Sequence, residues 1–128
     1  MVVTLVTAGG LGLLYLILSF RVVAVRRSAR VEIGDGGNRI LLSRIRAHGN
    51  FAEYVPLSLF LLFLAEQAHG ASTLLVTLAA VLGVSRLLHP MGMAMRAPNV
   101  PRFVGALGTF SVLAVLAGMV LWAGVQLL

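Results

Sequence analysis

Apolar residues fill four long stretches of the chain, and short polar or glycine-rich segments separate them. The stretches run over Val2–Phe20, Phe51–Ala65, Leu74–Leu88 and Phe103–Leu128. A membrane-spanning helix needs about 20 mainly apolar residues, so the two shorter stretches must extend into their polar flanks. The pattern predicts four helices in one domain of residues 1–128, with helices over 3–30, 39–67, 72–95 and 101–127.

Composition places these helices in a membrane. Hydrophobic residues make up 59% of the 128 residues, and the mean hydropathy is +1.01, which is far above that of soluble domains. The glycine-rich segment 34–38 predicts a turn after the first helix, His69-Gly70 predicts the end of the second, and Pro101 suits the start of the fourth. We therefore expect an all-α membrane protein, a four-helix bundle that runs up, down, up and down.

Positive charge marks one side of this bundle. All ten basic residues are arginines, the formal charge is +6, and nearly all of them flank the first and third connections. Arg96 and Arg102 bracket the third connection, whereas the second has no basic residue. By the positive-inside rule, the first and third connections are cytoplasmic and both termini lie outside. Because the arginines sit at helix ends, they favour contact with lipid headgroups and argue against nucleic-acid binding.

The chain has no cysteine, which excludes disulfides, a protein thiolate nucleophile and zinc–thiolate sites. Met91, Met93 and Met95 are close in sequence, but without histidine or cysteine partners they do not indicate a copper site. We predict no metal site.

A polar stripe stands out in the second predicted helix. Arg46, Asn50 and Glu53 follow one another at spacings of four and three, so they share one face. Leu57 and Phe60 continue this face as apolar residues, so the polarity is expected only in the cytoplasmic half. Ionisable groups within a membrane are costly and must face a partner, a cavity or a ligand. The stripe is either a pocket for an anionic or zwitterionic ligand or an ion pair that only fixes packing.

Three further residues extend the candidate site from the other half of the chain. Arg86 and His89 are one helical turn apart just before Pro90, which removes one backbone hydrogen bond and predicts a kink there. Arg102 lies at the start of the fourth helix, where a cation is opposed by the helix dipole. We therefore expect an additional interaction to favour it.

The run from Arg46 to Pro56 resembles the MAPEG family, the membrane-associated proteins in eicosanoid and glutathione metabolism. The family pattern Arg-Ala-x-x-Asn-x-x-Glu-x-x-Pro is matched at Arg46, Ala47, Asn50, Glu53 and Pro56. The length, the four spans and the basic first loop also agree, and the pair His89 and Arg102 has the spacing of a glutathione-site pair in one branch of the family. The chain most resembles the short bacterial members, which implies an inner-membrane location.

This resemblance implies a homotrimer that binds glutathione on the cytoplasmic side, between helices of neighbouring subunits. It implies that glutathione contacts seven residues and that an eighth, Arg102, is catalytic and stabilises the thiolate; the seven are Arg26, Arg46, Asn50, Glu53, Tyr54, Arg86 and His89. Glutathione carries two carboxylates, one ammonium and a thiol with a pKa of about 8.5, which a nearby guanidinium lowers. The nucleophile then belongs to glutathione, which explains thiol chemistry in a chain without cysteine.

Our leading hypothesis is therefore a membrane-bound glutathione transferase or peroxidase that acts on lipophilic electrophiles arriving from the bilayer. Met93 and Phe103 depart from the family pattern, which argues against an eicosanoid isomerase and makes a non-catalytic scaffold a second hypothesis. A third is a small proton-coupled multidrug exporter in which Glu53 couples proton movement.

Overall fold

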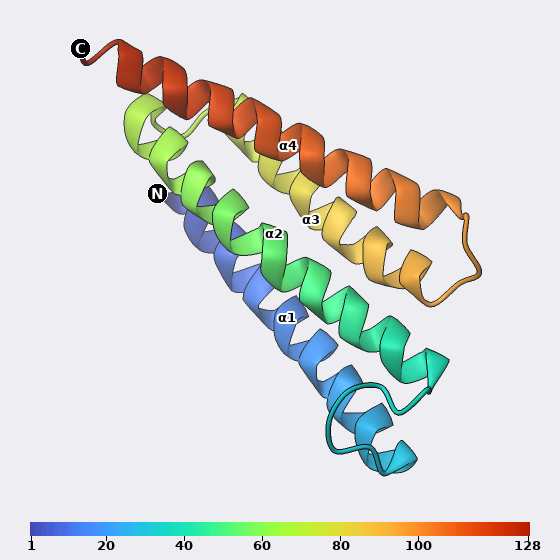
Figure 1. The fold of residues 1–128 in the computed structure, drawn as a ribbon. Helices are drawn as coiled ribbons and strands as arrows, with labels where there is room; N and C mark the ends of the chain where they lie inside the picture. Colours follow the sequence, from blue (N-terminus) through green and yellow to red (C-terminus); the bar gives the residue numbers. More distant parts are fainter.

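The computed structural model describes residues 1–128 as four long helices joined by three short connections. The helices are α1 (Val2–Ala29), α2 (Arg39–His69), α3 (Thr73–Met93) and α4 (Val100–Val125). Each is long and apolar enough to cross a membrane, and no strand is present. The predicted fold class is confirmed: the chain is an all-α membrane protein with an up-down-up-down order of helices (Figure 1).

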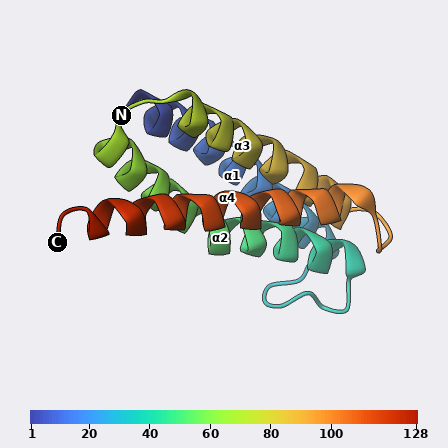
Figure 2. The same cartoon turned by 90° about the horizontal axis from the view of Figure 1, so that it is seen from above.

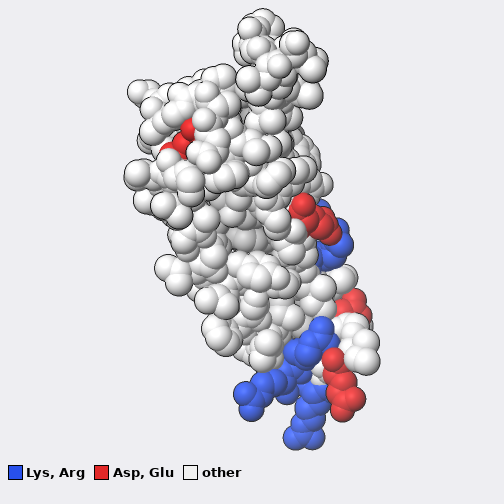
Figure 3. Space-filling model, turned by 90° about the vertical axis from the view of Figure 1, so that its left-hand side faces the viewer, with Lys and Arg blue, Asp and Glu red and all other residues white.

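The two ends of the bundle differ in character. The α1–α2 and α3–α4 connections lie at one end, and both termini lie with the α2–α3 connection at the other (Figure 1). We call these the basic end and the terminal end, because nine of the ten arginines lie in or near the α1–α2 and α3–α4 connections. Figure 3 shows a face on which charged side chains gather at one end and uncharged residues cover most of the rest.

The helix boundaries follow from local chemistry. Asn38, Ser72 and Asn99 begin α2, α3 and α4, and each side chain accepts a hydrogen bond from the first turn of its helix. Three glycines of the first connection have positive φ, as the predicted turn requires. Gly70 caps the end of α2, which confirms the predicted stop signal. The α3 helix continues through Pro90 and ends at Met93.

The four helices share one apolar core of leucine, valine, alanine and phenylalanine side chains, to which each helix contributes. The packing is most extensive between α3 and α4 and between α1 and α2, while α1 and α4 do not touch. Apolar residues also cover the outer faces, as expected of helices that contact lipid on their outside. The bundle is therefore two helical hairpins, held together mainly by α2, which packs against both α3 and α4.

Contacts of His48 with α1 tie the first hairpin together. The ring of His48 stacks on Tyr15 with 4.7 Å between the ring centroids. Its Nε2 lies 3.0 Å from the hydroxyl of Ser19, which donates its own proton to the carbonyl of Tyr15. His48 thus joins α2 to α1.

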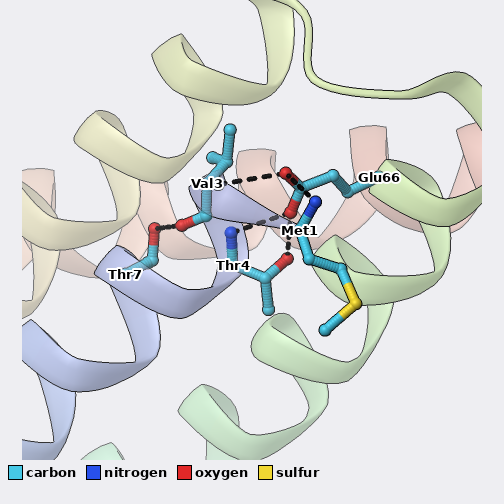
Figure 4. A network of polar contacts seen from close by, with 5 residues as sticks. All are labelled: Met1, Val3, Thr4, Thr7 and Glu66. Carbon is cyan, nitrogen blue, oxygen red and sulfur yellow. Dashed lines mark hydrogen bonds and ion pairs between the residues drawn. The ribbon is translucent and has the colours of Figure 1, made fainter.

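Glu66, near the end of α2, was missed by the sequence prediction. Its carboxylate is only 2% exposed and faces the first turn of α1 (Figure 4). The amides of Val3 and Thr4 donate to it at 3.0 and 2.8 Å, and the Thr4 hydroxyl donates at 2.6 Å. The amine of Met1 also lies 3.0 Å away. Figure 2 shows this end of α2 beside the N-terminus. The expectation that polarity is confined to the cytoplasmic half of the second helix is therefore wrong.

Candidate functional site

Arg86 forms the centre of the polar interior at the basic half of the bundle. Its side chain extends from α3, and the residue is only 2% exposed. One terminal nitrogen donates to Oδ1 of Asn50 on α2, and the other donates to the carbonyl of Gly105 on α4, both at 3.0 Å. The arginine therefore joins three helices through neutral acceptors, and its buried Nε has no partner. A cation held in this way without a carboxylate is costly in a protein interior.

Close packing of α3 against α4 fixes the position of this arginine and of His89. His89 is one turn further along α3 and only 5% exposed. The two helices approach closely because Gly105 has no side chain. A Cβ there would lie 2.7 Å from the amide nitrogen of His89 and 2.8 Å from the carbonyl oxygen of Ser85. Thr109 donates to the same Gly105 carbonyl as Arg86, at 2.8 Å, so the seam between the helices is polar as well as tight.

An open cavity of about 840 Å³ lies between the beginning of α2 and the connection from α3 to α4. Its charged lining consists only of arginines, namely Arg39, Arg44, Arg46, Arg96 and Arg102. We call this cavity the basic groove. It brings together Arg46 and Arg102, two of the residues expected in the site, although they are far apart in the sequence.

The walls of the basic groove are tied to one another by polar contacts near its base. The Ser43 hydroxyl on α2 donates to the carbonyl of Met93 at the end of α3. The amide group of Asn99 donates to the carbonyls of Gly92 and Arg96, and its oxygen accepts from the backbone amide of Arg102, all at 3.0 Å. The first turn of α4, which carries Arg102, is thereby held against the end of α3.

The polar stripe of α2 divides between the inside and the outside of the bundle. Asn50 is half-buried and turns toward Arg86, whereas Arg46 and Glu53 are exposed. Arg46 and Glu53 do not form an ion pair with each other, because the only salt bridge in the chain joins the N-terminal amine to Glu66. An interpretation of these residues as a self-contained packing device is therefore unsupported.

Of the eight predicted site residues, only Arg46 and Arg102 line the groove; Tyr54 and Arg26, like the other four, lie away from it. The ring of Tyr54 packs edge-on against Phe110, with 5.3 Å between the centroids. Arg26 donates from one terminal nitrogen to the carbonyls of Val31, Glu32 and Gly34, at 3.0 to 3.3 Å. Arg26 therefore closes the connection after α1, and its contact with glutathione stays a prediction.

Sequence analysis missed Asn99 and Ser43, which hold the groove together. Asn99 had a recognisable signal, because an asparagine two residues before a helix-initiating proline is typical of a helix N-cap. Ser43 had none, since its partner is a backbone carbonyl of a distant helix.

Comparison with known proteins agrees with this architecture. Residues 4–122 match the sequence profile of the MAPEG family. The chain is 43% identical over 81 residues to a protein named "Inner membrane protein YecN" from Escherichia coli strain K12, and equally so to its counterpart from E. coli O6:H1 strain CFT073. These matches cover 62% of this chain and 61% of each relative. The profile spans all four helices and both walls of the basic groove, and the chain belongs to the MAPEG family.

Proposed function

We propose that the protein binds glutathione in the basic groove and activates its thiol for transfer to, or reduction of, lipophilic electrophiles or peroxides from the bilayer. The observation that carries this proposal is the convergence of Arg46 and Arg102 on one open cavity. The Arg86–Asn50 contact lies close to it along α2. Because the positive-inside rule makes the basic end cytoplasmic, the groove would open toward the compartment that contains glutathione.

The chemistry of the groove suits the ligand. Guanidinium groups bind carboxylates with two parallel hydrogen bonds, and glutathione offers two carboxylates. Further along α2 and outside the groove lining, Glu53 supplies the negative charge for its ammonium group, and Asn50 and Tyr54 add neutral hydrogen-bonding groups. Asn50 is held in one orientation by Arg86, so part of the site is ordered before the ligand arrives.

We assign Arg102 the role of stabilising the thiolate sulfur of glutathione. It follows the cap of α4, and no acidic residue lies in the first turn to neutralise it. A guanidinium near the thiol lowers the thiol pKa and favours the thiolate. The released proton passes to water in the open groove. The sulfur then forms a bond to the electrophilic carbon, and the leaving group departs with the bonding electron pair.

The exposed charges of α2 favour an oligomer. On the isolated subunit Arg46 and Glu53 lie on an outer face within a helix that spans the membrane. A charged side chain facing lipid is costly, and a second copy of the chain removes that cost by covering the face. We infer a homotrimer, as in the family, that lies in the bacterial inner membrane with both termini outside. The name of the relatives from E. coli supports the membrane assignment.

Titration with glutathione tests the binding step. Calorimetry on the detergent-purified protein should detect binding, and Arg46→Ala and Glu53→Gln should each weaken it at least about tenfold, because each removes a charged contact. Arg30→Ala is the matched control, since Arg30 is exposed at the same end but does not line the groove. A wild-type protein that gives no binding signal contradicts the proposal and leaves the exporter and scaffold hypotheses.

Arg86→Met separates function from stability. Methionine removes a buried cation whose acceptors are neutral, and Gly105 keeps its bond from Thr109. The free energy of unfolding should therefore stay within about 1 kcal/mol of wild type or rise. Glutathione affinity should fall at least about fivefold, because Asn50 loses the group that orients it. Loss of stability with unchanged affinity for glutathione would show that Arg86 serves packing alone.

A further inference from the structure

The basic groove carries more positive charge than the proposed ligand balances. Five arginines line it, and no aspartate or glutamate does. Glutathione in its thiolate form has two carboxylates, one thiolate and one ammonium, a net charge of −2. Like charges that share one cavity repel each other. A second anion is therefore needed to balance the groove even when glutathione is bound.

The excess positive charge lies at the outer part of the groove. Arg39 is the first residue of α2, and Arg96 is in the connection between α3 and α4, so both are at the basic end. Arg46 lies seven residues further along α2, which is about 10 Å at a rise of 1.5 Å per residue. Both Arg39 and Arg96 are exposed. The arginines therefore fall into an outer group and a group deeper in the membrane, which contains Arg46.

Two helix N-termini meet at this outer part. Arg39 and Ile40 of the groove are the first residues of α2, and Arg102 lies in the first turn of α4. The first turn of neither helix contains an acidic residue. Helix N-termini attract anions and disfavour cations, so arginines are favourable here only when an anion lies between them.

The groove also has an apolar side that suits a lipid. Half of its lining residues are hydrophobic, and Ile40, Leu42 and Met95 are exposed. The basic end marks the level at which the spanning helices leave the membrane, where lipid headgroups lie. A ligand with a phosphate beside acyl chains matches both kinds of lining.

We propose that Arg39 and Arg96, with Arg44 beside them, form a binding site for the phosphate of an anionic phospholipid at the mouth of the basic groove. Guanidinium groups bind phosphate oxygens in pairs, and the acyl chains lie along the exposed apolar residues at the bundle surface. The phosphate adds a negative charge beside the arginines that glutathione does not balance, and the lipid forms part of the rim of the groove.

A soluble lipid of this class tests the site. Dioctanoyl phosphatidylglycerol is titrated into the full-length protein in neutral detergent, with wild type compared to the double variant Arg39→Gln/Arg96→Gln. The variant should bind at least about tenfold more weakly. The matched control is Arg27→Gln/Arg30→Gln, which removes the same charge from exposed residues at the same end and should change affinity less than about twofold. Equal weakening in both double variants would mean unspecific attraction and overturn the proposal.

Two further measurements identify the ligand. Dioctanoyl phosphatidylcholine, which has no net charge, should bind at least about tenfold more weakly than the glycerol lipid. Inorganic phosphate should not displace the glycerol lipid at equal concentration; displacement would assign the site to free phosphate and overturn the lipid proposal.

Glutathione titration of the same samples separates this proposal from the proposed function. Arg39→Gln/Arg96→Gln should lose affinity for the lipid by a larger factor than for glutathione, and Arg46→Ala should keep its lipid binding while losing glutathione. Intact glutathione binding without specific lipid binding in wild type overturns only the lipid site. The reverse result overturns only the proposed function.

Discussion

Gly105→Ala should destabilise the protein more than any other single methyl addition to α4, by about 3 kcal/mol. The added Cβ would fall 2.7 Å from the amide nitrogen of His89 and 2.8 Å from the carbonyl oxygen of Ser85. Both are backbone atoms of α3, so no side-chain rotation relieves the overlap and the two helices must move apart. The same carbonyl of Gly105 accepts from Arg86 and Thr109, so separation also disrupts the polar seam. Unfolding by SDS in mixed micelles measures the change.

Gly118→Ala is the matched control for this experiment. Gly118 lies on the same helix, and a Cβ there would meet no atom within 4 Å. The substitution is identical in chemistry and should change the free energy of unfolding by less than about 1 kcal/mol. Because alanine favours a helix more than glycine does, helix propensity cannot cause a loss of stability; if both variants lost the same stability, the close packing of α3 on α4 would not explain the effect of Gly105→Ala.

Arg102→Ala should remove most of the glutathione thiolate that forms on the protein. A thiol with a pKa of about 8.5 is only about 3% ionised at pH 7, and a neighbouring guanidinium that lowers the pKa by about two units makes thiolate the main form. Removing the guanidinium reverses this shift. Difference absorbance at about 240 nm, where thiolates absorb, should therefore fall by about twentyfold in the variant at saturating glutathione, and any turnover should fall with it.

Binding must be measured beside absorbance in this experiment, because a variant that binds no glutathione also shows no thiolate. Arg102→Lys keeps the positive charge and should retain part of the signal, since the shift in the thiol pKa is electrostatic. Arg27→Ala removes an exposed arginine that does not line the groove and should leave the signal intact. A full thiolate band in Arg102→Ala with normal binding would assign activation to another residue.

Much of the fold follows from sequence because its determinants are local. Four apolar stretches separated by turn residues are enough to specify four spanning helices, and the observed helices begin and end within two residues of the predicted positions. Caps such as Gly70 also act within one turn of the chain. The outward orientation of the Glu53 side chain could not be predicted in this way, because it depends on the rotation of α2 about its axis relative to the other three helices. Periodicity places Arg46, Asn50 and Glu53 on one face, but it does not tell which edge of that face meets the bundle.

Part of the site could be predicted because the motif residues are chemically distinctive. Arg46 and Arg102 were expected in one site, and they line one cavity. The contact of Arg86 with Asn50 and Gly105 could not be predicted, since it depends on the register between three helices that are distant in sequence. The role of Glu66 could not be predicted for the same reason. Its partners are backbone amides of α1, and because every residue except proline has a backbone amide, the sequence does not mark these partners.

The carboxylate of Glu66 sets an order for the assembly of the chain in the bilayer. Val3 and Thr4 lie in the first turn of α1, yet the oxygens that accept from their amides belong to the end of α2. Unpaired amides are expensive in a medium without water. The first turn of α1 therefore stays near the water interface until α2 has crossed, and the two spans reach their final depth together.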